Sequence, residues 1–151
     1  MSGAKSVVMA VDPGTHESGY CRFSDGRVLS SGVMPNEDLR KVLADDNSDV
    51  LAIEKIVSYG SAVGQETFDT CVWVGRFMEA WGQPDDVMLI PRRMVKKFVC
   101  GPGKHGDPEV RAALIRLLGP QGSKKAPGPT YGVKSHAWAA LAVAVTAANQ
   151  G

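Results

Sequence analysis

Short apolar runs separated by turn residues fill most of the first half of the chain, and this pattern predicts β-strands. The predicted strands are Ser6–Val11, Gly19–Phe23, Arg27–Val33, Val50–Glu54 and Val87–Ile90. Pro13-Gly14 and Asp25-Gly26 are strong turn signals between the first three strands, so we expect these three to form an antiparallel meander. The run Val50–Glu54 is compact and apolar, which favours a strand buried on both faces.

Apolar residues at helical spacing predict helices that alternate with the later strands. The predicted helices are Asn36–Asp45, Val63–Trp81, Arg92–Val99, Asp107–Leu118 and Ala137–Ala148. We expect Asn36, Asp107 and Ser135 to act as N-terminal caps. Strands that alternate with helices predict a single α/β domain over residues 1–151, with a mixed five-stranded sheet in which three antiparallel strands are continued by parallel ones.

The predicted helix Val63–Trp81 is apolar around much of its circumference. Its apolar residues fall into two stripes, Phe68, Cys71 and Val72 in one and Val74, Phe77, Met78 and Trp81 in the other. Such a helix is buried on two sides. We expect one side to cover the sheet and the other to form the twofold interface of a homodimer. Burial of both sides within one monomer is the alternative.

The composition is that of a soluble globular domain, with 44% hydrophobic and 22% charged residues in a chain of 151. No apolar run approaches the roughly 18 residues that a membrane span needs. Met1–Lys5 lacks the charged-then-apolar pattern of a signal peptide. We therefore expect a cytoplasmic protein that does not bind a membrane. The net charge of +1 excludes a uniformly basic nucleic-acid binder.

The charges are divided unevenly along the chain. Residues 1–89 contain seven Lys and Arg against fourteen Asp and Glu, which gives a net charge of −7. Residues 90–151 contain ten against two, which gives a net charge of +8. An asymmetry of this size points to a polyanionic partner or a metal ion.

Two carboxylates stand at the ends of predicted strands. Asp12 ends the first strand and Glu54 ends the fourth. If these strands are neighbours, the two side chains emerge together, and like charges a few ångströms apart are costly unless a cation neutralises them. Oxygen ligands suit Mg²⁺ or Mn²⁺ rather than zinc. We therefore expect a metal site here; turn chemistry at Asp12 and a solvated Glu54 are the alternative.

A third contribution is expected at the start of the last predicted helix. His136 and Ala139 are three residues apart, so they share one face of the first helical turn. His136 can serve as a metal ligand or as a general base near neutral pH. A polar residue at a helix N-terminus with no catalytic role is the alternative.

Three motifs in register carry a resemblance to a known family. The motifs are Asp12-Pro13-Gly14 followed by Gly19-Tyr20, then Ala52-Ile53-Glu54, then His136-Ala137-Trp138-Ala139-Ala140-Leu141-Ala142-Val143-Ala144. They resemble the motif blocks of RuvC-like Holliday junction resolvases, of the smaller phage-type branch as much as of the bacterial one. The resemblance implies an RNase H-like fold with helices on both faces of the sheet, a homodimer, and cleavage of paired strands at four-way DNA junctions in a bacterial or phage-infected cell. It also implies a site for two Mg²⁺ ions, or Mn²⁺, in which Asp12 and Glu54 are ligands and His136 is a ligand or a water-activating residue.

The resemblance departs from the family pattern at position 139. The pattern places an aspartate three residues after this histidine, whereas this chain has Ala139. One interpretation is natural drift to a good helix former. We favour an Asp→Ala change in the active site, because the surrounding residues keep the pattern. A site that clamps two Mg²⁺ ions about 3.5–4 Å apart needs its carboxylates, so the prediction is a nuclease that binds DNA but is inactive.

A basic surface is predicted on the helix Arg92–Val99 and in the loops that follow it. The candidate DNA contacts are Arg92, Arg93, Lys96, Lys97, Lys104, Lys124, Lys125 and Lys134. His105 is added because Lys104-His105 resembles the basic segment that contacts junction phosphates in the family. The four cations of the helix share one broad face by their spacing. The residues expected to pack on the sheet are Met94, Val95, Phe98 and Val99. We interpret the cations as phosphate contacts that position DNA without reading its sequence, and a solvated helix is the alternative.

Tyr59 follows Glu54 in the loop before the long helix. An aromatic ring there can stack on an unpaired base at the centre of a junction. A packing contact at the entry to the helix is the alternative.

Two other functions stay open at this point. One is a different RNase H-like nuclease with the same acids, which a comparison of four-way junctions with flaps, bubbles and RNA–DNA hybrids would distinguish. The other is a non-catalytic junction-binding protein in which Ala139 is natural.

Overall fold

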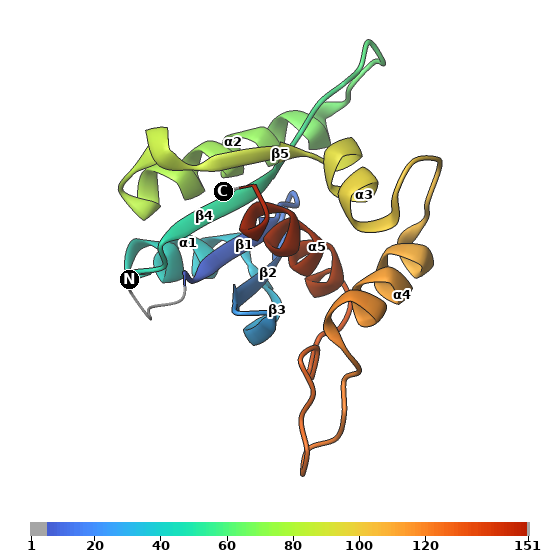
Figure 1. The fold of residues 1–151 in the computed structure, drawn as a ribbon. Coiled ribbons are helices and arrows are strands. Elements are labelled where there is room, and N and C mark those ends of the chain that lie inside the picture. Colours follow the sequence, from blue (N-terminus) through green and yellow to red (C-terminus); the bar gives the residue numbers. More distant parts are fainter. Residues whose placement is uncertain (1–5, 151) are drawn as a thin grey trace.

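The computed structural model describes residues 6–150, so the expectation for Met1–Lys5 lies outside the described residues. A single five-stranded sheet forms the centre of the molecule (Figure 1). Its strands are β1 Val8–Asp12, β2 Glu17–Ser24, β3 Arg27–Pro35, β4 Val50–Lys55 and β5 Met88–Pro91. The spatial order is β3-β2-β1-β4-β5. The first three strands pair antiparallel, whereas β4 pairs parallel with both β1 and β5, which confirms the predicted mixed sheet.

In the described part of the chain, five α-helices and one 3₁₀ turn connect and cover the strands. They are α1 Asn36–Ala44, α2 Gln65–Trp81, η1 Pro84–Asp86, α3 Arg92–Cys100, α4 Asp107–Leu118 and α5 Ala137–Ala148. Within residues 6–150, no helix is long and apolar enough to cross a membrane.

Helices pack against both faces of the sheet. Alternate residues of a strand point to opposite faces, so Ala10 packs toward α5, while Met9 and Val11 pack toward α1 and α2. In Figure 1, α5 lies across the near side of the sheet. Ten of the twelve residues of α5 are buried, and most are alanine or valine. Small side chains let this helix approach the strands closely, which places its first turn beside the end of β1.

The three predicted helix caps are wrong. Helix α1 begins at Asn36 with Pro35 in the cap position, and the Asn36 side chain is buried in tertiary hydrogen bonds instead. Gly106 is the cap of α4, and its N–H donates to Glu109 Oε2 at 2.9 Å. At α5 the cap position falls on His136, because Ser135 has a left-handed backbone with φ of 53°.

Helix α2 has two apolar stripes, and only one of them is buried within the monomer. Phe77 and Trp81 are buried against the sheet and α1. Phe68 and Val72, on the other stripe, are 55% and 62% exposed, and Cys71 is also exposed. The alternative of burial within one monomer is therefore wrong, and the homodimer stays a prediction.

Candidate active site

Asp12 and Glu54 leave the sheet side by side. Strands β1 and β4 pair in parallel with Val11 opposite Ile53, so the next residue of each strand emerges at the same edge. Both carboxylates line one cavity of about 870 Å³, as predicted for neighbouring strands. Glu54 is 8% exposed and the Asp12 side chain is 15% exposed. This cavity is therefore the candidate active site.

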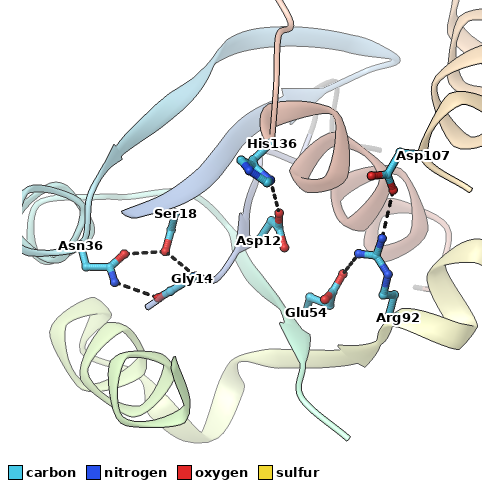
Figure 2. A network of polar contacts seen from close by, with 8 residues as sticks. All are labelled: Asp12, Gly14, Ser18, Asn36, Glu54, Arg92, Asp107 and His136. Carbon is cyan, nitrogen blue, oxygen red and sulfur yellow. Dashed lines mark hydrogen bonds and ion pairs between the residues drawn. The ribbon is translucent and has the colours of Figure 1, made fainter. Parts of the chain in front are cut away.

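A buried hydrogen-bond ring holds the turn that follows Asp12 (Figure 2). The Gly14 N–H donates to Ser18 Oγ at 3.1 Å, and the Ser18 hydroxyl donates to Asn36 Oδ1 at 2.6 Å. The Asn36 amide closes the ring by donating to the Gly14 carbonyl at 2.9 Å. Asn36 is 1% exposed, so this ring fixes the exit of β1 from within the core. The sequence pattern did not predict it, since Asn before a helix is a common cap.

Gly19 explains how the start of α5 comes close to Asp12. Gly19 lies opposite Asp12 in the β1–β2 register. A Cβ atom at Gly19 would collide with the backbone carbonyl of His136, so only glycine allows this approach. His136 Nδ1 then lies 3.7 Å from Asp12 Oδ2, and its side chain is 72% exposed. The structure thus brings His136 to the acids, as predicted.

Arg92 joins Glu54 to a carboxylate that the sequence pattern did not assign to the site. Arg92 Nη1 donates to Glu54 Oε1 at 3.3 Å, and Nη2 donates to Asp107 Oδ1 at 3.1 Å (Figure 2). Arg92 is the first residue of α3 and Asp107 is the first of α4. Two helix starts therefore meet at the cavity, a contact that no spacing within one helix predicts.

Burial changes the acidity of the two strand-end acids. Burial, and after it the neighbouring Glu54 charge, raises the pKa of Asp12 from 3.8 to about 7. Burial also raises the pKa of Glu54, although the Arg92 charge and hydrogen bond act in the opposite direction. A bound cation would relieve the cost of two ionised carboxylates at this place.

Ala139 lies on the wall of the same cavity. Between Ala137 and Ala147 it is the one residue of α5 that is not fully buried, because it faces the cavity rather than the sheet. A carboxylate at this position would enter the space that Asp12 and Glu54 share.

The donor set at the cavity is that of a hard divalent cation with incomplete protein ligation. Two adjacent carboxylates and one imidazole are present, and the cavity leaves room for water and phosphate oxygens. Across residues 6–150, no three His, Cys, Asp or Glu side chains are grouped closely enough to hold an ion by themselves. The chemistry of these donors fits Mg²⁺ or Mn²⁺, and the methyl of Ala139 contributes no ligand atom to the cavity.

The two arginines at the start of α3 point to different places. Arg92 contacts the acids, whereas the Arg93 guanidinium lies over the ring of Tyr59, 4.2 Å from its centroid. Tyr59 is 55% exposed, so it is not packed as a helix-entry contact in the core. Its loop, between β4 and α2, projects from the body of the molecule (Figure 1).

The other predicted DNA contacts are distributed around the cavity and the loops beyond it. Lys96 lines the cavity, and the exposed cations elsewhere are Lys97, Lys104, Lys124, Lys125 and Lys134. His105 is half-buried, with Nε2 at 3.2 Å from the Gly101 carbonyl and 3.1 Å from that of Pro102. Lys124 and Lys125 lie in the turn closed by the Gly122–Pro127 bridge.

The apolar side of α3 is narrower than predicted. Val95 and Val99 are buried, but Met94 and Phe98 are 48% and 44% exposed. One row of side chains is enough to pack a helix of this length on its neighbours, so the expectation that all four pack on the sheet is wrong for Met94 and Phe98.

Comparison with known proteins defines the class of fold. No family model and no curated protein matches the sequence. A structure of Thermus thermophilus RuvC in complex with Holliday junction substrate has a TM-score of 0.70 and 21% identity, covering 93% of this chain and 92% of that chain. A second Thermus thermophilus RuvC structure has a TM-score of 0.66 and 22% identity over the same shares. The chain therefore has the α/β fold of RuvC, an RNase H-like fold, as the three motifs implied.

The raised pKa of Asp12 gives the first prediction. The folded state holds this proton more tightly than the unfolded state, so its contribution to stability falls as pH rises from about 4 to about 7. Asp12→Asn removes the ionised form and should raise the free energy of unfolding by about 2–4 kcal/mol near pH 8. The gain should shrink toward zero near pH 3, because Asp12 is then mostly protonated in both states.

Urea denaturation in EDTA across this pH range measures the difference. The matched control is Asp45→Asn, at the exposed C-cap position that follows α1, where no buried carboxylate is removed. A gain for Asp12→Asn that is the same at both ends of the range would contradict the proposed burial of the charge.

Proposed function

We propose that this protein is a metal-dependent, structure-selective endonuclease that hydrolyses phosphodiester bonds at four-way (Holliday) and related branched DNA junctions. The observation that carries the proposal is the pair Asp12 and Glu54, which end adjacent parallel strands and share one cavity. Adjacent acids with raised pKa values in a cleft are a candidate catalytic centre on physical grounds. The RuvC-like fold supports the choice of substrate, since one such structure is a complex with a Holliday junction.

We assign roles to the site residues from the family resemblance together with their positions at the cavity. Asp12, Glu54 and His136 would hold Mg²⁺ or Mn²⁺, and two such ions, when bound, lower the pKa of the attacking water and stabilise the leaving 3′ oxygen. His136 is exposed and beside Asp12, so its ring can also accept a proton from a water at the cavity mouth. The buried ring at Asn36 keeps Asp12 in place. Hydrolysis would leave a 5′ phosphate and a nick that can be ligated.

The basic surface would position the DNA. Arg92 and Lys96 line the cavity, and the side chain of Lys97 on the same helix is exposed to solvent. Further phosphate contacts would come from the loop residues Lys104, His105, Lys124, Lys125 and Lys134. Such contacts hold the backbone without reading sequence. The exposed ring of Tyr59 offers a stacking platform for an unpaired base, with Arg93 behind it.

Ala139 makes this chain a nuclease that binds but does not cut. Its methyl faces the cavity where the family pattern has a carboxylate. The proposal is therefore that a carboxylate at position 139 completes the metal site. Ala139→Asp should give Mg²⁺-dependent cleavage of a synthetic four-way junction at least about 10³-fold faster than the parent chain, a difference of about 4 kcal/mol in the barrier.

The matched control is Ala139→Asn, which has nearly the same shape but cannot supply the negative charge, and it should stay inactive. Cleavage products on a denaturing gel measure both rates. Binding without cleavage by Ala139→Asp would favour a non-catalytic junction-binding protein. Faster cleavage of flaps, bubbles or RNA–DNA hybrids than of four-way junctions would favour a different RNase H-like nuclease.

A homodimer through α2 is the second part of the proposal. A four-way junction needs two coordinated cuts, which a twofold assembly supplies. The exposed apolar stripe of α2, formed by Phe68, Cys71 and Val72, is the surface that we assign to the partner copy. Covering such a stripe is favourable because it removes apolar area from water.

Val72→Asp should therefore weaken self-association by about 30-fold or more, as a charge in the centre of an interface does. Leu117→Asp is the control, because Leu117 is a similarly exposed apolar residue on α4. Sedimentation velocity across a concentration series measures both. An equal effect of the two substitutions, or a monomeric parent chain, would rule out this interface.

A further inference from the structure

Arg92 is the one arginine or lysine in the described part of the chain that contacts a strand-end acid directly. Its guanidinium bridges the two carboxylates: Nη1 donates to Glu54 at 3.3 Å, and Nη2 donates to Asp107 at 3.1 Å (Figure 2). Glu54 is nearly buried, whereas the Asp107 side chain is 86% exposed and sits at the outer edge. The Arg92 side chain is 45% exposed, so the bridge lies at the boundary between cavity and solvent.

The two bonds of Arg92 differ in what they do. The contact with Glu54 offsets the cost of a buried carboxylate beside Asp12. The contact with Asp107 joins two groups that water already solvates well, and an exposed ion pair of this kind is weak. Asp107 is therefore the partner that a competing anion can displace.

A phosphodiester has the chemistry of that competing anion. Its two non-bridging oxygens accept two parallel N–H bonds from one guanidinium, as a carboxylate does. The hydrogen bond to Glu54 already holds the Arg92 guanidinium at the mouth of the cavity. Arg93, its neighbour in sequence, is turned away onto Tyr59 and is not available there. Lys96 also lines the cavity, but Arg92 alone of the two contacts Glu54 directly, so Arg92 is the cation placed to receive a phosphate beside the acids.

We propose that Arg92 exchanges Asp107 for a DNA phosphate when the junction binds, and that Asp107 is a positioning residue that occupies the guanidinium until then. This inference rests on the proposed function and adds the group that recognises the phosphate nearest the acids. Asp107 orients the guanidinium in the free protein and competes with DNA for it. Removing its charge therefore tightens DNA binding through Arg92.

A double-mutant cycle in EDTA tests the exchange, because no divalent cation then bridges protein and phosphate. The ligand is a synthetic four-way junction, and its dissociation constant is measured by fluorescence anisotropy at several salt concentrations. The variants are the parent chain, Arg92→Gln, Asp107→Asn and the double variant. Glu17→Gln is the matched control, since Glu17 lines the same cavity but is not a partner of Arg92.

Arg92→Gln should weaken binding about tenfold, the loss of a charged hydrogen-bond pair, and lower the salt slope by about 1. Asp107→Asn should tighten binding at least about threefold more than Glu17→Gln does, and this excess should vanish when Arg92 is also replaced. Thermal melting of each variant detects a folding defect. The salt slope reports the number of phosphate contacts, and the loss of a residue with a merely structural role would not change it.

Two results would overturn the inference. If Asp107→Asn has the same effect with and without Arg92, the two residues are not coupled through DNA, and the nuclease proposal stands without the exchange. If the parent chain binds a four-way junction no more tightly than a linear duplex, the proposed function fails and this inference fails with it.

Discussion

The parallel pairing of β1 with β4 is the constraint on which the rest of the site depends. It places Asp12 and Glu54 at the same edge of a buried sheet, where neither carboxylate is fully solvated. Burial of two like charges is unfavourable, and the raised pKa of Asp12 expresses that cost. A bound cation would offset that cost, so the chemistry proposed for the site follows from the topology of the sheet.

The neighbouring elements position the two acids or supply positive charge to them, each through a different contact. Gly19 lets the start of α5 approach, which brings His136 to Asp12. The Asn36 ring fixes the turn through which β1 leaves the core. Arg92 supplies positive charge to Glu54 from the start of α3. The acidic first half of the chain contains the two acids proposed to bind cations, and the basic second half contains the groups proposed to face phosphate. The net charge of +1 therefore says little about the partner.

Sequence pattern predicted the sheet and the acids because both depend on local signals. Apolar runs end at Asp12 and Glu54, and turn residues follow Asp12 directly, so the strands and their carboxylates could be located. The pairing of β1 with β4 was the condition on which the predicted metal site depended, and the sequence pattern did not establish it. The roles of Asn36 and Asp107 could not be predicted, because each departs from a common local role as a helix cap to satisfy a tertiary contact. Ser135 is not the cap of α5 because its backbone has a left-handed conformation.

The central claim is that Asp12 and Glu54 bind a divalent cation together. Calorimetric titration of Mn²⁺ into the Ala139→Asp variant, without DNA, tests it most directly. The account predicts binding that is lost in Asp12→Asn and in Glu54→Gln but kept in Asp107→Asn, which removes a charge at the edge of the same cavity. Binding that survives both strand-end substitutions, or that depends on Asp107 alone, would contradict it.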